Sequence, residues 1–460
     1  MTAQLTQGVE QQPWLVADVD LADGVPALPA VDDAGQPAGG AFVLVRLFTE
    51  PVAGLWLAMP GAGLSREEIG RAADAQAGSA LRARLHAAGW RDDQAGLPLD
   101  GVAPDGRPSW LQGRDAAEAS SAGLTAVLCT RDRPEGALRC LDSLQQQCYP
   151  RLQVMVVDNA SGDDRMRRFV DSGQFRVPVR YLAEPVPGLS HARNRAVAEC
   201  ETELIAFLDD DEVACRWWAS ELVRCFLEEP GADCITGLIV PRELQTPAQQ
   251  LYERFGGHSK GRGFRPVTFD GRQLGKTRAL FPLPPFGTGG NMAFRVAALR
   301  ELGGFDTVLG AGTATRGGED TDIFSSLLLD GRRIAYRPAA LVWHYHRSTL
   351  EELRSQLYGY GMGLTAFYTA VVARHPLYVF RLLALAPRAI REVLGSGGIR
   401  SQSFGEAFPA DLLAANRSGL VHGPVAYWTS RRRQRRLRSR RPSEPAWPQP
   451  DAGHGGAAPC

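Results

Sequence analysis

The chain has 460 residues, a mass of 49.8 kDa and equal numbers of basic and acidic residues, 51 of each. This length allows about three domains and excludes a mini-protein. Apolar residues make up 44% of the chain, yet no uninterrupted apolar stretch approaches the roughly 20 residues that cross a bilayer, so we do not expect an integral membrane protein.

The first residues and the cysteines both favour the cytoplasm. Residues 1–12 have neither a basic segment nor an apolar segment of the kind found in secretion signals. The eight cysteines are scattered through apolar segments, without the paired spacings of a zinc site. We therefore expect reduced thiols in the core of a cytoplasmic protein.

Residues 1–120 are predicted to form a small α+β module followed by a linker. Residues 41–58 alternate as two strands around a turn at Glu50–Gly54. Ser65 and Glu68 have the spacing of a capping box, which predicts a helix running to Trp90. Residues 91–120 are rich in Gly, Asp, Pro and Ser, which indicates a linker.

The pattern changes at Leu124 to short apolar runs that alternate with helical stretches. The runs are Leu124–Cys129, Leu152–Val157, Val179–Leu182 and Leu204–Leu208. Such alternation predicts an α/β domain with a mostly parallel sheet and flanking helices, which we place at residues 121–349. Polar residues follow several of the runs, so a ligand crevice is expected at the carboxyl ends of the strands.

Two further regions complete the chain. Residues 350–430 are predicted to be helical, with breaks at Pro376 and Pro387, and such helices could pack on the body or lie on lipid. Residues 431–460 are predicted to be a basic, disordered tail. Arg431–Arg441 contains eight arginines and no acid, so the remainder of the chain is mildly acidic.

The acidic run Asp209–Glu212 directly follows the apolar strand LIAFL. Alternation along an extended chain would turn Asp209 and Asp211 to one side and Asp210 away. Carboxylates concentrated on one side suit Mg²⁺ or Mn²⁺. The alternative is a solvated acidic turn.

Asp158 ends another apolar run and could accept a hydrogen bond from a base or ribose, although helix capping or an Asx turn is an equal alternative. The run Thr125–Asp163, followed by PGLSHARNRA and FLDDDE, resembles the nucleotide-binding half of family 2 glycosyltransferases. The resemblance spans about residues 122–350. It implies a GT-A fold, a Rossmann-like sheet that binds a nucleoside-diphosphate sugar.

The resemblance implies roles for residues on the donor side. Thr130 and Asp158 match positions that contact the nucleotide. Arg193 and Asn194 match positions near the donor, where an arginine could pair with phosphate, the alternative being a surface helix residue. Asp209 and Asp211 match the DxD-type motif, in which the last aspartate commonly binds a divalent metal, Mg²⁺ or Mn²⁺.

The resemblance also implies which residues contact the acceptor and which carboxylate is catalytic. Gly289, Gly290 and Asn291 match an acceptor-side glycine-rich stretch, the alternative being a tight turn. Glu319 and Asp320 fall at the position of the catalytic carboxylate, the alternative being helix capping. His344 matches a region where some family members place a histidine near the metal or diphosphate; a core histidine is the alternative for His344 and the favoured interpretation for His346.

The expected function is therefore inverting transfer of a sugar to an acceptor hydroxyl, with Asp320 as the base and a metal on Asp211 stabilising the leaving diphosphate. Such an enzyme would serve the synthesis of envelope polysaccharide, glycolipid or another glycoconjugate. A lipid-linked acceptor would suit docking of Arg431–Arg441 on the anionic inner face of the plasma membrane, and nucleic acid is the less favoured partner. The rivals are a nucleotidyltransferase, for which a lysine-bearing glycine-rich loop is missing, and a non-enzymatic peripheral binding protein.

Overall fold

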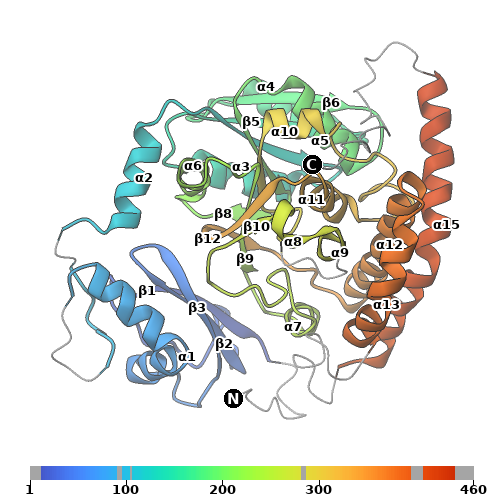
Figure 1. The fold of residues 1–460 in the computed structure, drawn as a ribbon. Helices are drawn as coiled ribbons and strands as arrows, with labels where there is room; N and C mark the ends of the chain where they lie inside the picture. The colour runs from blue at the N-terminus through green and yellow to red at the C-terminus, as the bar shows by residue number, and fades with distance from the viewer. Residues whose placement is uncertain (1–11, 91–95, 104–105, 281–285, 395–407, 441–460) are drawn as a thin grey trace, which may run out of the picture.

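The computed structural model describes residues 12–90, 96–103, 106–280, 286–394 and 408–440. These residues form a three-stranded sheet, a nine-stranded sheet and a group of helices at the carboxyl end (Figure 1). The division of the chain into domains stays a prediction from the sequence.

The three-stranded sheet contains β1 (Trp14–Asp20), β2 (Gly40–Leu47) and β3 (Glu50–Ala58) in that order. The two predicted strands are confirmed, but β1 was not foreseen and the turn lies at Phe48–Thr49 rather than at Glu50–Gly54. Both turn residues have positive φ, 47° and 71°, as a tight hairpin requires. Asp20 stabilises the turn, because its carboxylate accepts both backbone N–H groups at 2.9 and 2.5 Å.

Helix α1 (Arg66–Ala87) covers this sheet, and its predicted capping box is confirmed. The predicted linker is partly wrong, because it contains helix α2 (Ser109–Ala119). Arg114 of α2 is buried and pairs with Glu221 at 2.6 Å on α6 (Trp218–Glu228). Glu221 and Glu50 of β3 also both pair with Arg224. A buried ionic network thus joins the small sheet to the large one.

The large sheet has the order β10-β12-β9-β11-β7-β4-β5-β6, with β8 beside β12. Six strands, β4, β5, β6, β7, β9 and β12, run in one direction and three run against them. The mostly parallel α/β class is therefore confirmed. The strands are β4 (Leu124–Thr130), β5 (Leu152–Asn159), β6 (Val179–Glu184), β7 (Leu204–Asp209), β8 (Glu212–Ala214), β9 (Cys234–Pro241), β10 (Val267–Asp270), β11 (Met292–Arg295) and β12 (Arg333–His344).

Helices cover both faces of this sheet. Side chains of α3 (Pro134–Gln145), α4 (Arg165–Ser172) and α6 pack into one apolar core, and those of α5 (Leu189–Glu199) and α11 (Glu319–Leu329) into the other. Short helices occupy the connections: α7 (Pro247–Arg254), α8 (Gly271–Leu274), α9 (Lys276–Ala279) and α10 (Val296–Glu301). The seven described cysteines are free thiols, five of them buried and two, Cys148 and Cys215, half-buried.

Three helices close the chain: α12 (Leu350–Arg374), α13 (Tyr378–Leu394) and α15 (Ala410–Arg440). Helices α12 and α15 lie side by side (Figure 1), with glycines at their contact. A methyl group on Gly361 would lie 2.1 Å from the carbonyl oxygen of Asn416, and one on Gly419 would lie 2.1 Å from that of Tyr358. The two backbones therefore approach closely.

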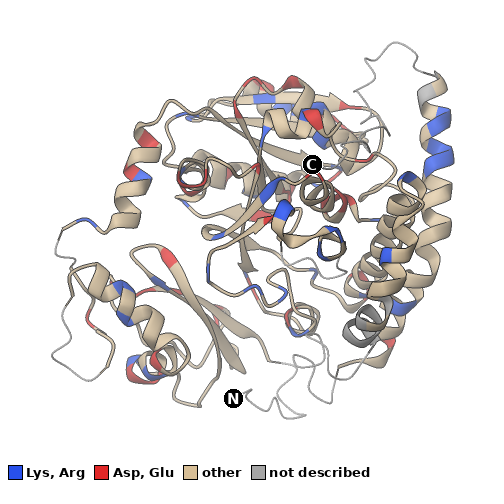
Figure 2. Cartoon of the chain, viewed as in Figure 1, with Lys and Arg blue, Asp and Glu red and all other residues tan. Residues whose placement is uncertain are grey.

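The prediction of a disordered basic tail is wrong for residues 431–440, which continue α15. Two side chains near this stretch contact the body: Ser430 Oγ donates to the carbonyl of Val308 at 2.7 Å, and Gln434 Oε1 contacts His191 Nε2 at 2.9 Å. Packing of this kind extends a helix that charge repulsion alone would disfavour. Basic residues cluster at the end of α15 (Figure 2), and residues 441–460 lie outside the described part. Among the described helices, none combines the length and apolarity needed to cross a membrane.

Candidate active site

The predicted nucleotide and metal residues gather where neighbouring parallel strands end. Thr130 ends β4 opposite Asp158 of β5, and Asp209 ends β7 opposite Cys129. Asp158 is buried and accepts hydrogen bonds from Tyr181 at 3.0 Å and from Ser161. The crevice expected at this edge is thus lined by the residues that the sequence singled out.

Arg193 of α5 is the buried centre of the site, with 1% of its side chain exposed. Its guanidinium donates to Asp209 Oδ1 and Glu319 Oε1, each at 3.2 Å, and to the carbonyl of Gly289 at 3.0 Å. The surface-residue alternative is therefore wrong. The expected pairing with phosphate is also not what the structure shows, because two carboxylates and a carbonyl already occupy the guanidinium. Arg193 instead links β7, α11 and the glycine-rich loop.

Asn194 does not face the site. Its side-chain amide pairs with the backbone of Phe305, donating to the carbonyl and accepting the N–H, both at 2.8 Å. The expected contact of Asn194 with the donor substrate is therefore wrong. Both polar atoms of its side chain hold the loop at Phe305, so its role is structural.

Asp210 and Asp211 form the turn between β7 and β8, so the strand alternation expected for them does not hold. Both carboxylates approach Arg133, whose Nη1 lies 2.9 Å from Asp210 Oδ1 and 3.3 Å from Asp211 Oδ2. Asp210 also accepts from Thr130 Oγ1 at 2.9 Å. Burial and the neighbouring Asp211 charge raise the pKa of Asp210 to about 6.

Asp211 faces a set of cationic and imidazole groups. His344 Nε2 lies 3.3 Å from Asp211 Oδ1, and Arg347 Nη2 lies 3.1 Å from Oδ2. Burial by itself would raise the pKa of Asp211, but His344 and Arg133 outweigh it and hold the pKa at about 2. The carboxylate of Asp211 is thus ionised throughout the neutral range.

The carboxylates of α11 are placed by its first turn and by the glycine-rich loop. Asp320 Oδ2 accepts the N–H of Gly289 at 3.1 Å, and its Oδ1 accepts the N–H of Thr321 at 2.6 Å. Burial and the adjacent Asp320 charge raise the pKa of Glu319 to about 7. Gly289 therefore connects Arg193 on one side with Asp320 on the other.

The rest of the glycine-rich loop packs inward. A methyl group on Gly290 would lie 2.1 Å from Glu212 Oε1, a buried oxygen with no hydrogen-bond partner in the described residues. Asn291 is completely buried, accepts from Trp218 Nε1 at 2.9 Å and donates to the carbonyls of Leu238 and Ala340. The acceptor-side role expected for Asn291 is wrong, because its amide supports the bulge of β12 beside β9.

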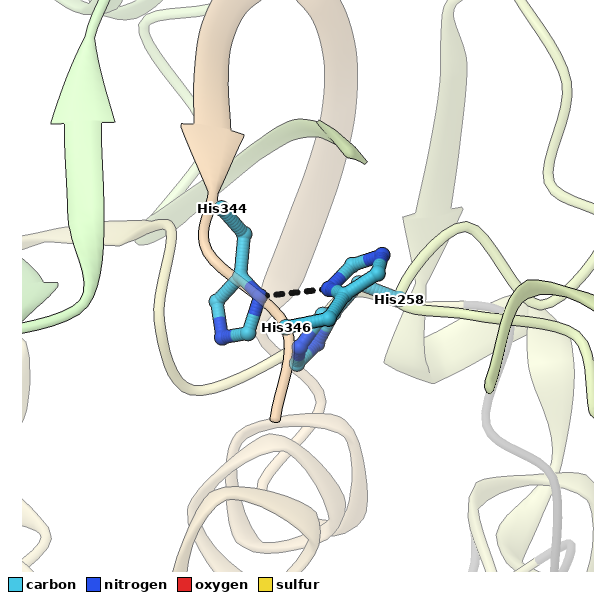
Figure 3. A group of neighbouring side chains, drawn as sticks. All are labelled: His258, His344 and His346. Carbon is cyan, nitrogen blue, oxygen red and sulfur yellow. Dashed lines mark hydrogen bonds between the residues drawn. The ribbon is translucent and has the colours of Figure 1, made fainter. Parts of the chain in front are cut away.

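His344 ends β12, His346 follows it, and both lie beside His258 (Figure 3). The two Nδ1 atoms of His344 and His346 are 2.7 Å apart, and His346 Nε2 is 2.7 Å from Glu253 Oε1. The sequence analysis missed His258 and Glu253. Glu253 lies on α7 and His258 in the turn after it, and only the three-dimensional fold brings both to the end of β12. No local motif could therefore have found them.

A pocket of about 340 Å³ opens next to Asp211, lined by Arg316, Arg347, Glu352, Ser355, Gln356, Gly359 and Tyr360. Arg347 belongs both to this pocket and to the contacts of Asp211. Gln356 Oε1 is buried and has no partner among the described residues, so it could accept a hydrogen bond from a bound molecule.

The donor atoms around Asp211 fit a hard divalent cation. Two ligand atoms that each lie about 2.1 Å from one ion are themselves separated by about 3.0–3.4 Å. The 3.3 Å between Asp211 Oδ1 and His344 Nε2 lies in this range.

Residues 125–303 match the family model described as glycosyl transferase family 2. This match supports the resemblance to family 2 glycosyltransferases for that part of the chain. Among curated relatives it is 30% identical over 267 residues to a pre-mycofactocin glycosyltransferase of Mycobacterium tuberculosis, covering 55% of this chain and 48% of the relative. It is also 30% identical over 221 residues to the succinoglycan biosynthesis protein ExoM of Rhizobium meliloti, covering 47% and 64%.

Among solved structures, a mannosyltransferase of Pyrobaculum calidifontis in complex with GDP-Man and Mn²⁺ aligns over 71% of this chain and 83% of its own. The TM-score is 0.43 and the identity 18%. The chain spans about half the length of the first curated relatives.

Proposed function

We propose that the protein is an inverting glycosyltransferase that moves a sugar from a nucleoside-diphosphate donor to an acceptor hydroxyl. The observation that carries this is the continuous set of contacts joining Asp209, Arg193, Gly289 and Asp320 at the carboxyl edge of the sheet. These contacts support Asp320 as a candidate base close to the acidic turn. A binding protein without catalysis would need no such arrangement.

In this proposal Asp320 accepts the proton of the acceptor hydroxyl while that oxygen attacks the anomeric carbon. Hydrogen bonds from the N–H groups of Gly289 and Thr321 fix the carboxylate, and the side chain is half-buried, so it is held in place while still open to a substrate. Glu319 is directed to Arg193 instead and serves the structure of the site.

Asp211 and His344 would hold Mg²⁺ or Mn²⁺, which when bound supplies Lewis-acid stabilisation of the departing diphosphate. Arg347 and Arg133 lie next to Asp211 and add positive charge where the diphosphate charge would develop. Asp158 remains the proposed nucleotide contact. Thr130 contributes indirectly, since its hydroxyl holds Asp210.

The pocket beside Arg347 is the proposed acceptor side of the site. It offers guanidinium donors and the unpartnered acceptor Gln356 Oε1, which are groups that hydrogen-bond sugar hydroxyls. Contact with an anionic membrane surface through α15, and hence a lipid-linked acceptor, is the further part of this proposal.

A panel of sugar nucleotides, assayed for metal-dependent release of nucleoside diphosphate with and without membrane extract, tests the function. Asp211→Ala should abolish release and weaken Mn²⁺ binding in calorimetric titration with donor. Asp171→Ala, which removes an exposed carboxylate on α4, is the control and should behave as wild type. Equal Mn²⁺ affinity in wild type and Asp211→Ala would contradict the proposed metal site.

A further inference from the structure

Arg262 lies in the loop between α7 and β10, and among the described residues no carboxylate forms an ion pair with it. Its guanidinium donates to two backbone carbonyls, that of Gly287 at 3.4 Å and that of His258, and its Cζ lies 5.6 Å from the centre of the Tyr336 ring. The Nε–H is buried and, within the described ranges, has no hydrogen-bond partner. Carbonyl dipoles compensate only part of a full charge, so this guanidinium would be stabilised by an anion.

Thr288, directly after Gly287, carries a second polar group without a partner. The side chain is buried, with 4% of the residue exposed, and its Oγ1 has no hydrogen-bond partner in the part of the chain that the structure describes. Buried hydroxyls normally have one, so this oxygen is available to a bound molecule. A methyl group on Gly287 would lie 2.4 Å from Cγ2 of Thr236, which shows that this part of the loop is packed tightly against β9.

Three consecutive residues of the glycine-rich loop connect Arg262 to the proposed base. Arg262 donates to the carbonyl of Gly287 at one end. At the other end, the N–H of Gly289 donates to Asp320 Oδ2 at 3.1 Å. The two glycines are at most about 7 Å apart, because two residues of extended chain cover that length. A substrate group held by Arg262 would therefore lie close to the hydroxyl that Asp320 deprotonates.

The pocket on the acceptor side has an excess of positive charge. Its lining includes Arg316 and Arg347 but only one carboxylate, that of Glu352. Lys260, from the same loop as Arg262, lies next to this pocket, with its Nζ 5.9 Å from the centre of the ring of Tyr360, which is another lining residue. Positive charge around a concave site favours anionic ligands.

We propose that Arg262 and Thr288 form a recognition site for an anionic group, a carboxylate or a phosphate, carried by the acceptor or by the transferred sugar. The Nε–H of the guanidinium and the hydroxyl of Thr288 would donate to the oxygens of that group, in hydrogen bonds strengthened by charge. The inference rests on the proposed function, because it names the substrate class of the same site. Arg262 should accordingly distinguish substrates that differ only in that group.

Binding to the full-length protein, followed by NMR titration without turnover, measures this preference. One series of probes consists of free sugars: methyl glucoside, methyl glucuronide and glucose 6-phosphate. The other series compares UDP-glucose with UDP-glucuronic acid. In wild type the anionic member of at least one series should bind about tenfold or more tightly than its neutral counterpart. Preference in the nucleotide series assigns the anion to the transferred sugar, and preference among the free sugars alone assigns it to the acceptor.

Variants of the two residues test whether they cause the preference. Arg262→Gln should remove it, and Arg262→Lys, which keeps a charge but lacks the Nε–H, should retain part of it. Thr288→Val keeps the shape of the side chain and should weaken binding of the anionic probe about three- to tenfold. Arg265→Gln, which removes an exposed arginine from the same loop, is the matched control and should behave as wild type.

Equal affinity for anionic and neutral probes in both series of wild type would overturn the proposal, and so would an undiminished preference in Arg262→Gln. Thermal unfolding checks that each variant is folded, and if Arg262→Gln is not, Arg262→Lys and Thr288→Val decide in its place by the same comparison. Failure of the proposed function is separate, because these titrations need neither metal nor turnover. It would appear as no release of nucleoside diphosphate from any sugar nucleotide of the panel.

Discussion

Asp320 and Glu319 are neighbours in the chain, yet they face different partners. Asp320 accepts two backbone N–H groups, whereas Glu319 pairs with the buried Arg193. A base must be able to reach the substrate proton, and only the half-buried Asp320 keeps part of its side chain open. One residue therefore suits catalysis and the other suits the framework of the site.

Asp320→Asn should lower kcat by about 10²–10⁴-fold and leave donor binding within a few-fold, because the amide keeps the shape but cannot take a proton. Steady-state kinetics and donor titration on the same protein measure both. If Asp320→Asn turns over normally and Glu319→Gln is inactive, the base has been assigned to the wrong one of the two residues.

Glu319 should make stability depend on pH. Its pKa of about 7, above the ordinary 4.5, means that between these values the folded protein holds a proton that the unfolded chain releases. The free energy of unfolding therefore falls as pH rises through this window, by at most about 1.4 kcal/mol per pH unit from this group. Glu319→Gln cannot titrate, so the stability difference between wild type and Glu319→Gln should decline over the same window.

Urea unfolding of both proteins at intervals from about pH 4 to pH 8 measures that difference. Taking the difference removes titration shared by the two proteins, including that of Asp210. A difference that stays constant across the window would show that Glu319 is ionised throughout beside Arg193.

Asn291, whose side chain was expected to contact the acceptor, instead holds the glycine-rich loop against the neighbouring elements. Asn291 joins Trp218 of α6 to carbonyls on β9 and β12. Its contacts cross the bulge where the register of β9 and β12 shifts, and a bulge leaves backbone groups without ladder partners. Asn291 thus satisfies groups that would otherwise be buried and unpaired.

Asn291→Ala should reduce the free energy of unfolding by about 2–4 kcal/mol, since each unsatisfied buried group costs about 1–3 kcal/mol. Urea unfolding measures the loss, and Gln146→Ala, which removes an exposed hydrogen bond at the end of α3, should change stability by less than about 0.5 kcal/mol. A stable Asn291→Ala protein with a raised KM for acceptor would instead restore the acceptor-side role.

Local patterns predicted several elements but few of the contacts. The apolar runs located β4, β5, β6 and β7, and the Ser65–Glu68 spacing located α1, because these signals depend on residues close in the chain. The predictions that failed concern residues whose contacts lie on segments far away in the sequence. Arg193, Asn194 and Asn291 were identified as site residues, but their partners lie on other elements, so the sequence could not show that all three face inward.

The basic helix illustrates the same limit at the carboxyl end. Composition predicted disorder for residues 431–440. In the structure, Gln434 of this stretch contacts His191 of α5, and Ser430 directly before it donates to the carbonyl of Val308. The arginines are consequently displayed on a fixed helix, not on a free tail (Figure 2). The position of these arginines on α15 therefore decides which other side chains could contact a membrane together with them.

One face of α15 carries exposed apolar side chains followed by exposed arginines. Val421, Val425 and Trp428 are 75%, 68% and 46% exposed, and Arg432 and Arg435 continue the same three- and four-residue spacing. Leu377, directly before α13, and Phe380 and Leu383 of α13 are 76%, 68% and 62% exposed. Apolar and basic groups combined in this way suit the interface of an anionic membrane.

Replacing Arg432, Arg433, Arg435 and Arg436 by Gln should reduce sedimentation with anionic vesicles at least about tenfold, because each arginine near such a surface contributes about 1 kcal/mol before screening. Gln434 and Ser430 stay intact, so α15 keeps its contacts with the body and release of nucleoside diphosphate from soluble donor should not change. Arg167→Gln with Arg168→Gln on α4, which removes two exposed arginines elsewhere, should sediment as wild type.

Higher salt should weaken wild-type binding, since screening acts on the same charges. Wild-type protein that remains in the supernatant with anionic vesicles at low salt would contradict the membrane contact and remove the support that α15 gives to a lipid-linked acceptor.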